Sequence, residues 1–164
     1  MIYLLDASAL ITAHNTYYGR HRVPEFWAWV RHHGTAGTLK MPDEVFAEVR
    51  DGTDALAEWM ADDASKAALI LKEETNLDHV QTVLARYGDE LSEADMVRIG
   101  RDPFLIAAAL GDPQERCVVT AEVWRPNRRG ANRHVPNVCH DVGVSWITPI
   151  DLLDALDFST GWDA

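Results

Sequence analysis

Four acidic residues have similar surroundings in this sequence, although they are far apart along the chain. Asp6, Glu48, Asp102 and Glu122 each stand beside a stretch of apolar residues. Carboxylate oxygens are preferred ligands of Mg²⁺ and Mn²⁺, and such an ion can lower the pKa of a bound water and neutralise charge on a phosphate. If folding brings these acids together, they form a site for a divalent cation. Their segments are YLLDASAL (3–10), MPDEVFAEV (41–49), RDPFLIAAAL (101–110) and VVTAE (118–122).

The pattern of apolar residues predicts the elements that would position these acids. Short apolar strands alternate with helical stretches, which predicts an α/β fold, a three-layer α/β/α sandwich with a central parallel sheet. Ligands of such sheets bind outside the carboxyl ends of the strands, where Asp6 and Glu122 would lie. The predicted strands are Ile2–Leu5, Thr38–Met41, Cys117–Thr120 and Val144–Thr148, with Ala67–Leu71 ambiguous between strand and helix. The predicted helices are Pro24–His33, Asp43–Arg50, Asp54–Met60, Leu77–Tyr87, Pro103–Leu110, Pro136–Val142 and Pro149–Leu156, and another helical pattern begins at Ser8.

Each acid also has a simpler structural interpretation. Asp102 precedes Pro103 and, taken alone, is well explained as a helix cap. Glu44, a further candidate, lies in a first helical turn, where the helix dipole favours an acid. Glu48 is harder to explain in this way, because it comes one turn after Glu44 and like charges at that spacing cost a few tenths of a kcal/mol. Burial of Asp6 at the end of an apolar strand would raise its pKa unless a cation or a donor favoured the charged form.

Composition limits the classes of protein to which the chain can belong. The 164 residues predict one domain over residues 1–156, followed by a loosely attached C-terminal tail over 157–164. The net charge of −11 argues against a nonspecific binder of nucleic-acid backbones, but not against a nuclease whose acids hold a cation. Cys117 and Cys139 lie in apolar segments without metal-ligand spacing, which indicates reduced core thiols, and the seven histidines are scattered, which argues against zinc.

Targeting signals are not visible in the sequence. The N-terminus has no basic region followed by a long apolar core, so no signal peptide is predicted. No apolar run approaches the roughly 18 residues that a membrane span needs. These features predict a soluble, cytoplasmic protein that does not bind a membrane.

The four acidic segments together resemble the motifs of the PIN-domain nucleases in order, spacing and strand context. The resemblance covers residues 2–156, and it is strongest to the bacterial branch that includes the VapC toxin ribonucleases. DPF at 102–104 and VPNVC at 135–139 are similar to one group within that branch. The resemblance implies a metal-dependent endoribonuclease that hydrolyses RNA phosphodiester bonds and acts as the toxin of a toxin–antitoxin pair.

The resemblance also assigns roles to individual positions. It implies that Asp6, Glu48 and Asp102 hold one or two Mg²⁺ or Mn²⁺ ions. Glu122 stands where the family usually has Asp, so its longer side chain leaves its reach to the ion open. The implied supporting residues are Ser8, Thr120, Glu44 and Asn137.

A basic segment directly follows the fourth acid and is the predicted RNA-binding surface. WRPNRRGANRH (124–134) places four arginines in a chain that is otherwise rich in acids. Guanidinium groups suit phosphates, and an indole can stack on a base. An ordinary solvated loop is the alternative, and TYYGRHR (16–22) is a second, weaker candidate. The residues predicted to contact RNA are Trp124, Arg125, Arg128, Arg129 and Arg133.

Partners follow from the resemblance and from charge. An antitoxin protein with basic side chains would suit the acidic chain, and a homodimer is expected by analogy. A PIN scaffold that binds RNA or a protein partner without cleavage stays open as an alternative, because Glu122 departs from the family pattern. A phosphatase of the haloacid dehalogenase type is disfavoured, since it needs a second Asp where Ser8 stands.

Overall fold

The computed structural model describes all residues, 1–164, and confirms the predicted α/β architecture. Four parallel strands form one sheet in the order β2-β1-β3-β4. Leu5 of β1 pairs with Val119 of β3, so these two central strands end at the same edge of the sheet. The strands are β1 (Ile2–Leu5), β2 (Leu39–Lys40), β3 (Arg116–Val119) and β4 (Ser145–Ile147).

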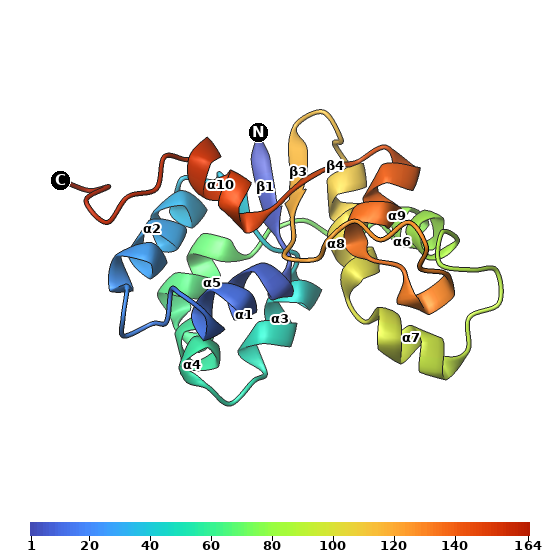
Figure 1. Ribbon diagram of the computed structural model, residues 1–164, viewed down its shortest axis with the longest axis horizontal. Helices are drawn as coiled ribbons and strands as arrows, with labels where there is room; N and C mark the ends of the chain where they lie inside the picture. The colour runs from blue at the N-terminus through green and yellow to red at the C-terminus, as the bar shows by residue number, and fades with distance from the viewer.

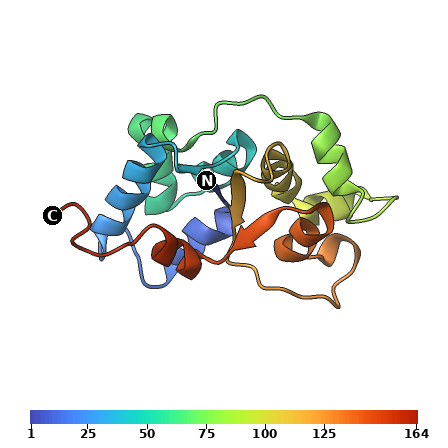
Figure 2. The ribbon, with the colours of Figure 1, turned by 90° about the horizontal axis from the view of Figure 1, so that it is seen from above.

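Helices cover both faces of this sheet, which makes three layers (Figure 1). The view from above shows the same division, with the early helices on one side and α6, α8 and α9 on the other (Figure 2). The helices are α1 (Ala7–Asn15), α2 (Pro24–Thr35), α3 (Asp43–Arg50), α4 (Ala55–Ala61), α5 (Asp63–Leu69), α6 (Leu77–Leu84), α7 (Glu93–Ile99), α8 (Asp102–Leu110), the 3₁₀ turn η1 (Gly130–Asn132), α9 (Val135–Val142) and α10 (Pro149–Ala155). None of them is both long and apolar enough to cross a membrane.

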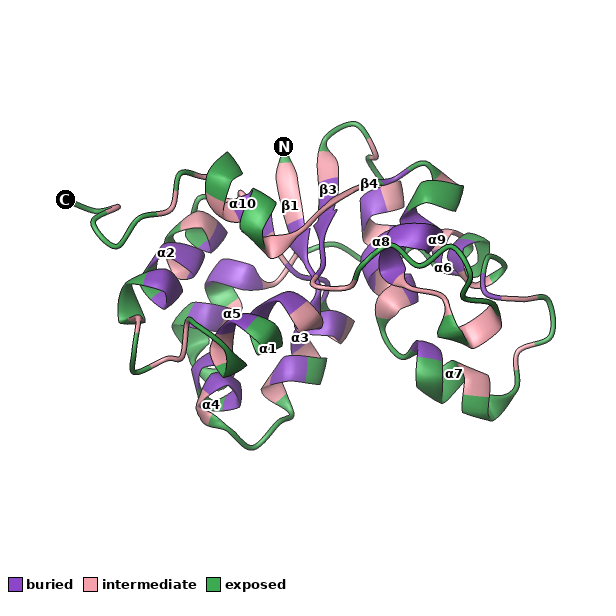
Figure 3. Ribbon diagram, viewed as in Figure 1, coloured by how far each residue is buried: buried purple, intermediate pink, exposed green.

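The core lies between the central strands and the helices on either face (Figure 3). Leu4 and Val118 are fully buried because β1 and β3 are flanked by other strands and covered by helices. Helix α8 is apolar around its whole circumference, which is typical of a helix packed on several sides. This rigid centre fixes the backbone from which the candidate site residues project.

Several segments differ from the sequence-based predictions, among them the stretch 67–71 and the C-terminal tail. The ambiguous stretch 67–71 is the end of helix α5, after which Ile70 makes a single bridge to Met41. The tail was expected to be loosely attached, but Phe158 packs against Trp29 at 5.1 Å between ring centroids. Trp162 Nε1 donates to Glu25 O at 3.1 Å. The tail is therefore in contact with α2, since its two aromatic rings gain contacts there.

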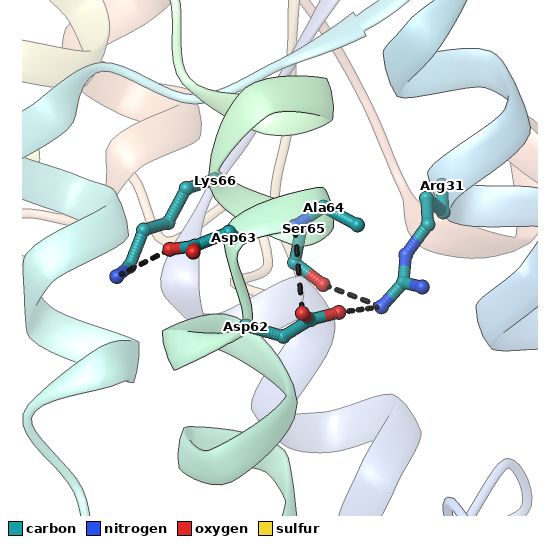
Figure 4. A network of polar contacts seen from close by, with 6 residues as sticks. All are labelled: Arg31, Asp62, Asp63, Ala64, Ser65 and Lys66. Carbon is teal, nitrogen blue, oxygen red and sulfur yellow. Dashed lines mark hydrogen bonds and ion pairs between the residues drawn. The ribbon is translucent and has the colours of Figure 1, made fainter.

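A polar contact joins α2 to the junction of α4 and α5 (Figure 4). Arg31 Nη2 donates to Asp62 Oδ2 at 2.7 Å and to Ser65 Oγ at 2.8 Å. Asp62 is the N-cap of α5 and accepts from the backbone of Ala64. This network holds the helices on one face of the sheet against each other and includes none of the four candidate acids.

Candidate functional site

The candidate acids gather at the carboxyl edge of the two central strands. Asp6 directly follows β1, and its backbone N–H donates to Val119 O at 2.9 Å. Glu122 lies three residues beyond the end of β3, and Asp102 is the first residue of α8, which packs on both strands. Glu48 projects from α3, which contacts both α1 and α8. The topology therefore brings four distant segments to one end of the sheet.

Two hydroxyl groups fix the carboxylate of Asp6. Ser8 Oγ donates to Asp6 Oδ2 at 2.5 Å, and Thr120 Oγ1 donates to the same oxygen at 2.7 Å. The other oxygen, Oδ1, receives no donor from the protein. The Asp6 side chain is only 6 % exposed, so these bonds replace much of its lost hydration. Ser8 and Thr120 thus have the supporting position that the resemblance implied.

Electrostatic coupling shows that the acids are neighbours. The pKa of Asp102 is raised to about 8, mainly by burial and then by the negative charges of Asp6, Glu122 and Glu48. The pKa of Glu48 is also raised, mainly by burial and then by Asp6, while Arg101 opposes the rise. Groups influence each other in this way only over short distances. All four predicted acids therefore share one electrostatic environment.

Glu44 is not part of this cluster. Its Oε1 accepts from Thr75 Oγ1 at 2.6 Å, on a cavity of about 270 Å³ that also contains Glu73 and Arg116. Arg116 binds Glu73 across this cavity at 2.6 Å. Between the two candidates of the second motif, the structure brings Glu48 and not Glu44 to the other acids. The predicted supporting role of Glu44 at the site is wrong, because its side chain is held by a different contact.

Glu122 and Asn137 join the basic segment to α9. Glu122 Oε2 accepts from Val135 N at 2.7 Å, at the first turn of α9, where the helix dipole favours a carboxylate. Asn137 is buried, and its Oδ1 accepts from Arg125 N at 2.9 Å. The amide oxygen of Asn137 therefore fixes the backbone of the basic segment and does not contact the acids. One oxygen of Glu122 remains without a protein donor.

The predicted RNA-binding residues divide into two groups. Trp124 is 43 % exposed, with its ring against His140, and Arg125 and Arg128 are exposed without an ion pair. Arg129 is exposed but donates to backbone carbonyls of its own loop. Arg133 is largely buried and is bound within the fold, so the structure does not support its predicted contact with RNA.

Arg133 has a structural role instead. Its Nη2 lies 2.7 Å from Asp141 Oδ2, and its Nη1 donates to Arg86 O at 2.7 Å. The side chain is only 19 % exposed, so its charge is already neutralised within the fold. Arg133 thereby ties the basic segment to the segment that follows α6.

Tyr87 was not identified from the sequence and lies close to the acids. It is 3 % exposed, and its hydroxyl has no hydrogen-bond partner. Its pKa is raised far above the usual range by burial and by Asp102 and Glu122, while Arg133 opposes the rise. The sequence gives no signal for this role, because Tyr87 reads as an ordinary apolar position at the end of a predicted helix.

The donor chemistry of the cluster fits a hard divalent cation. The acids offer oxygen ligands, and their mutual repulsion is the kind that a cation relieves. Both cysteines are free and buried, and burial raises the pKa of Cys117 to about 11 and that of Cys139 higher still, so neither offers a thiolate. No three acidic, histidine or cysteine side chains stand close enough together to enclose an ion. Binding therefore requires the carboxylates to rotate toward one another.

Replacement of Thr120 tests how firmly Asp6 is held. Thr120→Val is expected to lower the free energy of unfolding by about 1–3 kcal/mol, because Asp6 Oδ2 loses a buried donor and Glu122 N loses its acceptor. Urea unfolding measures this change. Thr82→Val serves as the control, since Thr82 is exposed and bonds only within its own helix, and a change of less than about 0.5 kcal/mol is expected there. Equal effects of the two substitutions would contradict the buried network.

Comparison with known proteins identifies a family but no activity. The chain matches one family model over residues 3–160, described as "Domain of unknown function (DUF4411)". No curated protein matches the chain. The family description names no reaction, so the resemblance to PIN-domain nucleases stays a prediction. Since the match includes every strand except the first residue of β1, and all four candidate acids, the chain belongs to the DUF4411 family.

Proposed function

We propose that the protein is an Mg²⁺- or Mn²⁺-dependent endoribonuclease and the toxin of a toxin–antitoxin pair. The observation that carries this proposal is that Asp6, Glu48, Asp102 and Glu122 gather from four distant segments at one edge of a parallel sheet. There the charges of the other three acids raise the pKa of Asp102. A structural role explains one or two of these acids, but a fold gains nothing from four repelling carboxylates. The resemblance to the PIN-domain nucleases supports the same conclusion.

Different residues of the chain would have different roles in this reaction. Asp6, Glu48 and Asp102 would hold one or two ions, and the free oxygen of Glu122 would contribute where it reaches them. Ser8 and Thr120 keep Asp6 in a fixed orientation. The ion would supply charge neutralisation at the scissile phosphate and a lowered pKa of the attacking water. Arg125 and Arg128 would bind neighbouring phosphates, and the exposed Trp124 would stack on a base.

A cleavage assay on total cellular RNA tests the reaction. We expect MnCl₂ to give cleavage that EDTA abolishes, with 5′-phosphate and 3′-hydroxyl ends at the new termini. Sequencing of those ends would identify the RNA target and the cut site. Absence of metal-dependent cleavage of RNA or DNA under any divalent cation would contradict the proposal.

The toxin role belongs to the same proposal but needs its own evidence. The net charge of −11 suits a basic antitoxin, and by analogy the protein would act in the cytoplasm as a homodimer. Expression of active protein should stop growth of its host unless an inhibitor is co-expressed. Normal growth in the presence of soluble, active enzyme would argue against this role while leaving the nuclease activity in place.

A second candidate function is a PIN-like scaffold that binds RNA or a protein without cleaving. Two observations favour it: one oxygen of Glu122 is committed to Val135 N, and no three potential ligands converge around a common point. Retention of RNA binding without cleavage in MnCl₂ would select this alternative.

A further inference from the structure

Tyr87 is held firmly in the core of the protein. Its backbone N–H donates to Leu84 O at 2.9 Å in the turn that ends α6. Arg133 fixes the preceding carbonyl, that of Arg86, at 2.7 Å. The ring belongs to the hydrophobic core, with 3 % of its surface exposed. The position of the phenol is therefore set by packing from both sides.

A fully buried position is unfavourable for the hydroxyl of Tyr87. It is buried and has neither a donor nor an acceptor, although buried hydroxyl groups in folded proteins nearly always have one. An unsatisfied buried hydroxyl destabilises the fold, and a phenylalanine would fill the same space without that cost. A partner that arrives in another state of the protein would explain why a hydroxyl stands in this position.

Among the groups that surround Tyr87, Asp102 is the most suitable partner. The charged and titratable groups that act on it are Asp102, Cys139, Glu122 and Arg133. Arg133 is only a donor and already binds Asp141, and a buried thiol is a weak acceptor. One oxygen of Glu122 already accepts from Val135 N, so its carboxylate is held toward α9. After burial, Asp102 has the largest effect on Tyr87, and no hydrogen bond holds its carboxylate elsewhere.

We propose that Tyr87 is a positioning residue whose hydroxyl donates to the carboxylate of Asp102 when the site holds a divalent cation, and so fixes that carboxylate as a ligand. This inference rests on the proposed function. The complete burial of the hydroxyl excludes direct contact with RNA, so Tyr87 acts through Asp102. Outer groups of this kind orient metal ligands, and their loss usually weakens metal binding by about 10- to 100-fold.

Tyr87→Phe separates this role from simple packing. In EDTA, the variant should melt at the same temperature as the wild type or higher, because it loses only an unsatisfied hydroxyl. In a titration with MnCl₂ alone, followed by the electron paramagnetic resonance signal of free Mn²⁺, the dissociation constant should rise about tenfold. At saturating MnCl₂, the KM for RNA should stay unchanged, since Tyr87 does not touch the substrate.

Tyr18→Phe is the matched control, because Tyr18 stacks on Phe26 in the aromatic cluster beside α2, away from the acids. Its Mn²⁺ affinity should equal that of the wild type. If Tyr87→Phe binds Mn²⁺ within twofold of the wild type, or melts lower in EDTA, the positioning role is wrong and the nuclease proposal is unaffected. If the wild type itself binds no Mn²⁺, both proposals fail together.

Discussion

Replacement of Asp102 by Asn is expected to lower the rate of RNA cleavage by about 10³-fold, which corresponds to roughly 4 kcal/mol of activation free energy. Asn keeps the shape of the side chain but removes the charge that would hold the cation. Asp102 interacts with all three other acids of the cluster, so its loss should affect the site more than the loss of a peripheral group. Single-turnover cleavage of a defined RNA in MnCl₂ measures the effect.

Glu44→Gln provides the matched control for this prediction. Glu44 lies in the same helix as Glu48 and its replacement removes the same charge, but its carboxylate binds Thr75 outside the cluster. We expect its cleavage rate to stay within about twofold of the wild type. Should Asp102→Asn cleave as fast as Glu44→Gln, the assignment of the active site would have to be abandoned.

The second large effect concerns the dependence of stability on pH in the metal-free protein. The pKa of Asp102 is raised to about 8 in the folded state, against 3.8 as the ordinary value. Between these values the unfolded chain gives up its proton while the folded protein keeps it, so rising pH favours unfolding. The free energy of unfolding in EDTA should therefore fall by on the order of 4 kcal/mol from pH 5 to pH 8. The raised pKa of Glu48 acts in the same direction.

Asp102→Asn removes this contribution, and the difference between the two proteins isolates it from all other titrating groups. Urea unfolding across this pH range in EDTA should show a flatter profile for the variant, which becomes the more stable protein at pH 8. Addition of MnCl₂ at pH 8 should stabilise the wild type by binding its ionised folded form, and should stabilise the variant much less. Parallel profiles for the two proteins would show that Asp102 is not buried among like charges.

The sequence predicted those strands and helices that depend on the local pattern of apolar residues and on residues that begin a helix. Strands β1 and β3 are buried apolar runs, and Pro103 marks the beginning of α8 as expected. Helix α7 was missed because only Ile99 of its residues is buried, so it lacks an apolar face. Its capping box, in which Ser92 and Asp95 bond reciprocally, was the signal that could have revealed it.

The site was predictable to the extent that it depends on the ends of strands. The rule that ligands bind at the carboxyl edge favours acids just after a strand or at the start of the next helix. It selected the four segments that carry Asp6, Glu48, Asp102 and Glu122 from 26 acids. The roles of Asn137 and Arg133 could not be predicted, because they depend on contacts with residues at other positions in the fold. Tyr87 could not be predicted for the same reason. Only the three-dimensional structure shows that its hydroxyl is buried without a hydrogen-bond partner.

The burial of the two thiols has a practical consequence. Cys117 lies in the central strand β3 and Cys139 in α9. Neither sulfur can be alkylated in the closed protein, because burial keeps both protonated and covered. Each reacts only while its own neighbourhood is open. The relative labelling of the two sulfurs therefore distinguishes complete unfolding from local breathing of α9, without any engineered probe.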